Sequence, residues 1–141
     1  MTTSINMTAN KTKTSLSVKI KMIAYWICTI LIALETAAGA QWDLSRNEFV
    51  RGIFNHLGYP VYLLTIIGIW KIPAFIAILV PRMLLIKEWA YAGLFFVYSG
   101  AFASHLAVGD VPAAWIGPLV FMMLTAGSWY LRPASRKLAN K

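Results

Sequence analysis

Long apolar blocks, separated by short polar or Pro/Gly-containing segments, dominate the pattern along the chain. A helix needs roughly 20 apolar residues to cross the hydrocarbon core of a membrane, and each block is long enough. Because lipid offers the backbone no hydrogen-bond partners, the blocks must be helices, and the alternation typical of a membrane barrel is missing from the sequence. The pattern predicts an all-α integral membrane four-helix bundle with spans at about 20–40, 59–80, 88–108 and 111–131.

The polar segments outside the spans set the predicted domain organisation. Residues 1–17 are rich in Thr, Ser, Asn and Lys, and we expect a disordered basic N-terminal tail there. A transmembrane domain then occupies 18–131, and a basic cytoplasmic tail occupies 132–141. Within the domain, residues 41–58 alternate apolar and charged side chains, which fits a short amphipathic helix on the outer surface or an irregular loop with some buried aromatic residues.

Basic residues gather on one side of the predicted bundle. They stand before the first span, in the turn between the second and third spans, and after the fourth: Lys11, Lys13, Lys19, Lys21, Arg82, Lys87, Arg132, Arg136, Lys137 and Lys141. The opposite side carries Arg46 and Arg51, so the positive-inside rule predicts that both termini are cytoplasmic. The start of the chain also resembles a cleavable signal peptide, but Glu35 lies where such a region prefers small neutral residues, so we expect no cleavage.

Composition narrows the function classes. Hydrophobic residues make up 59% of the chain and charged residues 13%, about half the charged share of a soluble domain, as suits a lipid bilayer. The net charge of +8 sits at the tails and one turn rather than on an aromatic-interleaved surface, so we expect no nucleic acid. With one cysteine, Cys28, and two histidines in different segments, we expect no disulfide and no metal site.

Ionisable residues inside predicted spans are the candidate functional residues, because a charge at membrane depth is costly. On the third span a ~100° arc, at 100° per residue, collects the polar side chains together with large aromatic ones: Glu88, Tyr91, Phe95, Tyr98, Phe102 and His105. We expect that face to turn inward. The predicted intramembrane polar pocket comprises Glu35, Lys71, Tyr91, Tyr98 and His105, with His56 and Asp110 at its outer mouth and Glu88 at the inner interface.

Two interpretations of this pocket stay open. It could pass protons or hold the head of a small ligand such as a quinone, and histidine suits either role because its pKa lies near ambient pH. It could instead be a buried hydrogen-bond network that fixes helix register. Lys71 lies between Gly68 and Pro73, and we expect it to pair with Glu35 or Glu88, or to extend toward the cytoplasm. Glu88 could simply begin a helix, where the helix dipole favours it.

The strings "HLGYPVYLLTIIGIWKIPAFIAILVPR" and "IKEWAYAGLFFVYSGAFASHLAVGD" resemble the DoxX-like family of small bacterial membrane proteins, from about Tyr25 to Leu131. The resemblance implies a four-helix bundle in the bacterial inner (plasma) membrane. The family is named after a subunit associated with thiosulfate:quinone oxidation, and some relatives are linked to membrane redox complexes. The residues that match the family pattern are His56, Gly58, Tyr59, Pro60, Lys71, Glu88, Trp89, Tyr91, His105 and Asp110.

Three hypotheses of function follow. The first, which the resemblance implies, is a subunit of a membrane redox or quinone-linked assembly, with quinone as ligand and a redox partner or a second copy of the chain as partner. The second is a small-solute or proton-coupled permeability protein. The third is a structural or assembly subunit without chemistry of its own. The single cysteine makes any thiol-based version of the first hypothesis unsuitable, and no hydrolase, nucleotide-binding or zinc-protease motif occurs in the sequence.

Overall fold

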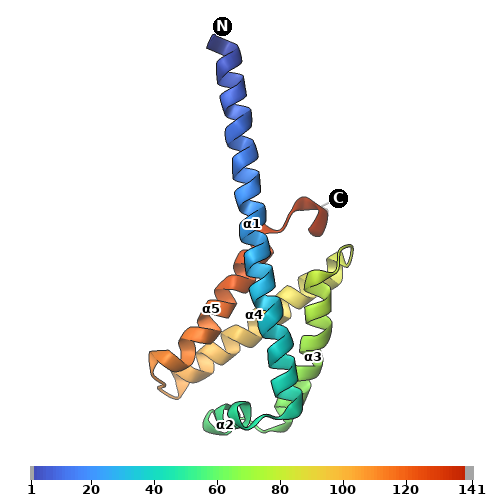
Figure 1. Ribbon diagram of the computed structural model, residues 1–141. Helices are drawn as coiled ribbons and strands as arrows, with labels where there is room; N and C mark the ends of the chain where they lie inside the picture. Colours follow the sequence, from blue (N-terminus) through green and yellow to red (C-terminus); the bar gives the residue numbers. More distant parts are fainter. Residues whose placement is uncertain (1, 139–141) are drawn as a thin grey trace.

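The computed structural model describes the backbone of residues 2–138 and the side chains of residues 16–138. All regular secondary structure in that part of the chain is helical. The elements are α1 (Thr2–Ser45), α2 (Glu48–His56), α3 (Tyr62–Leu79), α4 (Leu84–Ala107), α5 (Pro112–Leu131) and the short 3₁₀ helix η1 (Ala134–Arg136), all visible in Figure 1. The predicted all-α fold class is confirmed.

Among the described residues, three helical segments are long and apolar enough to cross a membrane: Leu16–Ser45 of α1, Tyr62–Leu79 and Pro112–Leu131. The remaining predicted span, 88–108, falls in α4, which is less apolar on average than α3 and α5. Its polar residues include Lys87, Glu88 and His105. A membrane crossing at α4, and with it the membrane-spanning four-helix bundle, stays a prediction.

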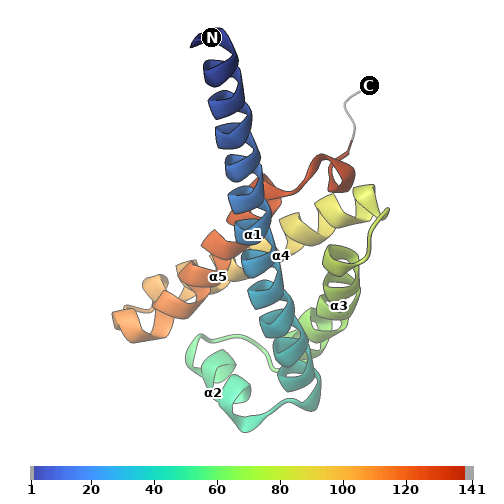
Figure 2. The ribbon, with the colours of Figure 1, turned by 45° about the horizontal axis from the view of Figure 1, so that its top comes forward.

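The long helices contact one another in pairs: α1 contacts α3 and α5, and α4 also contacts α3 and α5. Figures 1 and 2 show α4 and α5 side by side, with α1 crossing them at an angle. The α3–α4 turn and residues 132–138 lie toward one end, which we call the tail end (Figure 1). The helix α2 and the α4–α5 turn lie toward the other end, which we call the α2 end.

Helix α1 is longer than predicted at both ends. We expected residues 1–17 to be disordered, whereas the backbone is helical from Thr2 onward. Extending a formed helix adds one hydrogen bond for each residue fixed, so polar residues can continue a helix that an apolar run begins. At its other end α1 runs to Ser45, past the predicted limit at residue 40. In the predicted basic tail, 132–141, the structure describes η1, and residues 139–141 lie outside the described part.

Of the two alternatives for residues 41–58, the helix is confirmed. The Asn47 side chain caps α2 by accepting a hydrogen bond from the backbone N–H of Phe49 at 2.9 Å, and Glu48 in the first turn suits the helix dipole. Past the end of α2, Gly58 adopts a φ of +77°, a conformation that favours glycine. These local signals let a short helix lie across the α2 end.

The core lies between α1, α3 and α4, with side chains of α5 packed against it. Its fully or nearly buried members are Ile32, Ala33, Ala77, Ile78, Ala90, Tyr91, Leu94 and Tyr98. Close approach of α1 and α3 depends on Gly68, where a Cβ atom would come within 2.9 Å of Leu44 Cγ and 3.0 Å of Asp43 Cβ. Many large apolar side chains, such as Leu34 and Met123, point outward, which suits lipid rather than water.

Candidate functional site

A cavity of about 500 Å³ lies toward the α2 end, and all five α-helices contribute to its wall. Its volume falls within the range of about 300–1,000 Å³ that is typical of small-molecule sites. Most of the wall is apolar or aromatic, and α2 supplies four side chains of that kind, including Phe49 and Phe54. The ionisable and hydroxyl groups on the wall are Glu35, Asp43, Tyr59, Lys71, Tyr98, Ser104 and His105.

Lys71 on α3 forms an ion pair with Asp43 on α1, with Nζ 2.9 Å from Oδ2. Both side chains are buried, with 10% and 7% of their surface exposed. Gly39 makes room for the pair, because a Cβ atom there would lie 2.5 Å from Lys71 Nζ and 3.1 Å from Glu35 Oε1. The predicted pairing of Lys71 with Glu35 or Glu88 is therefore replaced by a partner that the sequence analysis did not consider.

The sequence prediction left out Asp43, because it ended the first span at residue 40. Helix α1 continues through Asp43, so Glu35, Gly39 and Asp43 follow one another at intervals of four residues on one face. That spacing was the available signal: two carboxylates flank a glycine on the helix face that turns toward a lysine. The Glu35 carboxyl stays beside the Lys71 ammonium without forming an ion pair at contact distance.

Tyr98 on α4 connects to α1 through its hydroxyl group. The hydroxyl donates a hydrogen bond to Glu35 Oε2, and it lies 3.4 Å from the Thr36 hydroxyl. The Tyr98 ring packs against Phe121 of α5 with ring centroids 5.6 Å apart. The half-buried Glu35 carboxyl is thus held at the cavity wall by a phenol that is itself fixed by packing.

Asp110, in the turn between α4 and α5, joins the two histidines. His105 Nδ1 lies 2.7 Å from Asp110 Oδ2, and His56 Nε2 lies 2.7 Å from Asp110 Oδ1. Both ring nitrogens donate, because an ionised carboxylate only accepts. The hydrogen bonds from His105 and His56 hold the pKa of Asp110 below its ordinary value. His105 is buried and lines the cavity, whereas the His56 side chain is 57% exposed, so the trio links the cavity wall to the surface.

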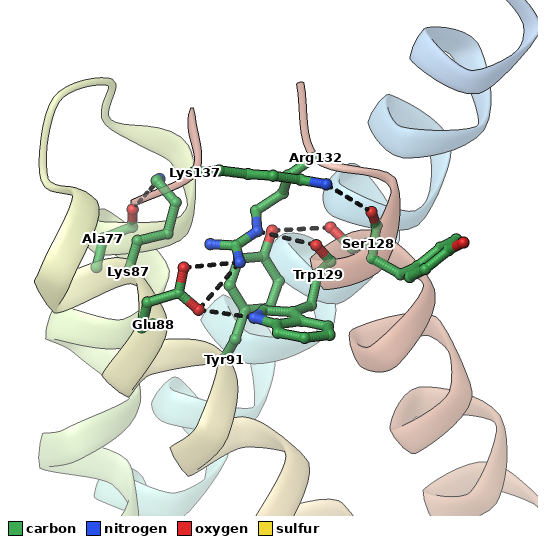
Figure 3. A network of polar contacts seen from close by, with 9 residues as sticks. Ala77, Lys87, Glu88, Tyr91, Ser128, Trp129, Arg132 and Lys137 are labelled. Carbon is green, nitrogen blue, oxygen red and sulfur yellow. Dashed lines mark hydrogen bonds and ion pairs between the residues drawn. The ribbon is translucent and has the colours of Figure 1, made fainter. Parts of the chain in front are cut away.

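A second polar cluster lies at the tail end (Figure 3). Glu88 accepts hydrogen bonds from the indole N–H of Trp129 at 2.7 Å and from Arg132 at 3.0 Å, and its other oxygen lies 2.8 Å from Arg132 Nη2. The Arg132 guanidinium stacks over the Tyr91 ring at 5.0 Å, and the Tyr91 hydroxyl lies 2.8 Å from the Ser128 hydroxyl. These contacts join α4 to the end of α5.

The neighbouring Lys87 caps the C-terminal end of α3. Its ammonium donates hydrogen bonds to the carbonyl oxygens of Ala77, Ile78 (2.8 Å) and Val80 (3.0 Å). Arg136 of η1 donates to the carbonyls of Ile78 at 3.3 Å and Leu79 at 3.1 Å. The last carbonyls of a helix have no partner within the helix, so these cations satisfy groups that would otherwise be unpaired.

The predicted pocket is therefore divided in the structure. Glu35, Lys71, Tyr98 and His105 line the one cavity, and His56 and Asp110 are joined to His105 beside it. Tyr91 does not line the cavity and instead belongs to the tail-end cluster with Glu88.

Within residues 16–138, no group of three or more His, Cys, Asp or Glu side chains is arranged to hold a metal ion. In the trio around Asp110, each carboxylate oxygen already faces a histidine nitrogen. The ionisable and hydroxyl groups on the cavity wall can form hydrogen bonds and exchange protons.

Comparison with curated proteins gives no match, and comparison with solved structures gives none either. The model of the DoxX-like family matches residues 27–128. That range covers most of the chain and contains every residue that lines the cavity. The resemblance noted in the sequence is thus confirmed, and the chain, a membrane protein, belongs to the DoxX-like family.

Proposed function

We propose that this chain is a quinone-binding membrane subunit of a redox assembly, and that the cavity toward the α2 end holds the quinone head. The observation that carries the proposal is the convergence of Lys71, His105 and the Glu35–Tyr98 pair on one cavity with mostly apolar and aromatic walls. A quinone head is flat and apolar, with two carbonyl oxygens that accept hydrogen bonds. A largely apolar site with a few placed polar groups is the usual way to bind such a molecule.

The polar groups on the wall have hydrogen-bonding capacity to spare. The Lys71 ammonium carries three N–H groups, of which the ion pair with Asp43 occupies one. His105 directs Nδ1 at Asp110, which leaves Nε2 for a ligand oxygen. In its neutral form Nε2 accepts a hydrogen bond from a quinol hydroxyl, and in its protonated form it donates one to a quinone carbonyl.

Reduction of a quinone to a quinol takes two electrons and two protons. In this proposal a partner redox subunit supplies the electrons, and the cavity wall supplies the protons. Glu35 can hold one proton at its carboxyl oxygen, and His105 can hold the other at Nε2. Asp110 links His105 to the exposed His56, so a proton given up at the cavity is replaced from the surface.

The proposal places the chain in the bacterial inner (plasma) membrane, with α4 as the fourth crossing and both termini in the cytoplasm. The greater number of basic residues toward the tail end supports this orientation. A fluorescent protein fused to either terminus should fluoresce, and alkaline phosphatase inserted after Gly52 in α2 should be active. An active phosphatase at the C-terminus would reverse the orientation.

The quinone site is tested by equilibrium binding of a tail-less benzoquinone to the full-length protein in lipid nanodiscs, followed by quenching of tryptophan fluorescence. His105→Phe and His56→Phe form a matched pair, because both histidines bind Asp110 but only His105 lines the cavity. We expect His105→Phe to weaken binding about tenfold, as the loss of roughly one hydrogen bond does. His56→Phe should change the affinity by no more than about twofold.

Two outcomes would remove the proposal. One is the absence of saturable quinone binding to the wild-type protein. The other is an equal effect of the two histidine substitutions, because it would mean that the quinone does not bind in the cavity that His105 lines. Extraction of a quinone from the protein purified in mild detergent, together with a co-purifying dehydrogenase, would support the wider role in a redox assembly.

A second candidate function is proton-coupled permeability, and the observation that favours it is the link from His105 through Asp110 to the surface at His56. It predicts proton or solute flux through the protein in liposomes, and it predicts that Lys71→Met changes that flux. Flux equal to that of empty vesicles would exclude it.

A further inference from the structure

A second hollow lies beside the cavity, on the outer face between α3 and α4. It is a groove of about 360 Å³ whose wall is apolar apart from Lys71. Trp70 on α3 and Trp89 on α4 belong to its wall, and each is 70% exposed. The groove is therefore open along one side, where lipid would surround the protein in the proposed orientation.

Small residues leave this groove unfilled. Ala90 and Gly93 line it on the α4 side, and Pro73 and Ala74 line it on the α3 side. A Cβ atom added at Gly93 would meet no atom within 4 Å, so the space beside that glycine is free. The chain thus places its smallest side chains along a strip where larger ones would have closed the gap between two neighbouring helices.

The groove and the cavity share part of their walls. Ile67 and Lys71 of α3 and Val97 of α4 line both. Lys71 therefore borders both spaces, and its ammonium is paired with Asp43. Of the three shared wall residues, Lys71 is the one with a polar group, and it combines an apolar stem with a charged head.

We propose that the groove holds the single apolar chain of the ligand whose head occupies the cavity. This inference rests on the proposed function and makes it more specific: the ligand is an amphiphile with a compact head that accepts hydrogen bonds and one alkyl or isoprenoid chain. The apolar chain of the ligand leaves the cavity beside Lys71, passes Gly93 and reaches lipid between Trp70 and Trp89. Apolar side chains of the groove then cover the apolar chain of the ligand, which begins where its polar head ends.

The glycines of the chain offer a matched set of variants. Gly93 lines the groove, Gly100 lines the cavity, and Gly52 on α2 lines neither. At each of the three, an added Cβ atom meets nothing within 4 Å, so a larger side chain can start there without a clash at its Cβ atom. The groove and the cavity can therefore be filled separately in the full-length protein.

The experiment compares a tail-less benzoquinone with the same benzoquinone bearing a decyl chain, in identical nanodiscs. We expect Gly93→Phe to weaken binding of the decyl compound about tenfold and to change binding of the tail-less compound by no more than about twofold. Gly100→Phe should weaken both, and Gly52→Phe should weaken neither. As a measurement without substitution, a photoreactive group on the decyl chain should label α3 or α4 between residues 66 and 97.

The outcomes separate this inference from the function on which it rests. If Gly100→Phe weakens both compounds and Gly93→Phe weakens neither, the groove holds bilayer lipid only, and the inference is wrong while the quinone site stands. Labelling spread evenly over all the helices would also overturn it. If the wild-type protein binds neither compound, the proposed function is wrong, and the inference that the groove holds the ligand's apolar chain is wrong with it.

Discussion

Breaking the ion pair between Lys71 and Asp43 should show whether the two charges act as a unit. We compare Lys71→Met, Asp43→Asn and the double variant. Lys71→Met keeps the length of the aliphatic stem and removes the charge, which leaves a buried carboxylate that is 7% exposed. Asp43→Asn keeps the shape of the side chain and leaves an ammonium that still has the Glu35 carboxyl beside it.

The magnitude follows from the geometry. At 2.9 Å and an effective dielectric constant of about 20, the Coulomb attraction is about 6 kcal/mol, and removal of both ions from water offsets most of it. Losing one partner leaves the desolvation of the other uncompensated. Lys71→Met should therefore lower the free energy of unfolding by about 3 kcal/mol, and Asp43→Asn by about 1–2 kcal/mol because Glu35 remains as a counter-charge. The double variant should lie within about 1 kcal/mol of the wild type.

The assay is reversible unfolding of the purified protein in mixed micelles, followed by tryptophan fluorescence. Lys21→Met, at an exposed lysine of α1, is the matched control and should change the free energy of unfolding by no more than about 0.5 kcal/mol. The predicted coupling energy of the cycle is about 4–5 kcal/mol, because the two single losses should nearly disappear in the double variant. Losses that simply add in the double variant, within about 0.5 kcal/mol, would refute the reasoning, because they would mean that the two charges do not depend on each other.

Three further substitutions test other parts of the structure. Gly68→Ala should lower the free energy of unfolding by about 1–3 kcal/mol in the same assay, because its Cβ atom would press on α1, whereas Gly52→Ala has open space and should not destabilise. The lowered pKa of Asp110 stabilises the fold above about pH 4, and this contribution is lost as the pH falls through the folded-state pKa. The free energy of unfolding of Asp110→Asn should therefore depend less on pH in acid than that of the wild-type protein. Glu88→Gln should weaken the contact with Arg132, lower the free energy of unfolding by about 1 kcal/mol and leave tail-less quinone binding unchanged.

The helices were predictable because apolar runs of membrane-spanning length report directly on helical segments. The ends of the helices were harder to predict, because the apolar run and the backbone hydrogen bonding of a helix end at different residues. At residue 40 the apolar run ends, but the helix continues to Ser45 and brings Asp43 onto the face of Glu35. The ion pair with Lys71 depends on those few extra residues, and a span defined by hydropathy alone hides it.

Tyr91 shows a different limit of the same kind of reasoning. The spacing of seven residues correctly places Tyr91, Tyr98 and His105 on one inward face, and all three are buried. Angle around a helix axis says nothing about height along it, and seven residues correspond to a rise of about 10 Å. Tyr91 therefore joins the cluster at the tail end, while Tyr98 and His105 reach the cavity.

Two buried lysines differ in how much of their hydrogen-bonding capacity the fold uses. The ammonium of Lys87 donates hydrogen bonds to three carbonyl oxygens at the end of α3, which uses its full capacity on the chain itself. Among the described residues Lys71 has one such partner, Asp43, and it faces an open volume. A buried cation whose donors are all used fixes helix ends, whereas one with donors to spare at a cavity wall is available to a ligand. The position of a charge in the membrane is therefore a weaker guide to function than the number of its hydrogen bonds that the fold leaves unmade.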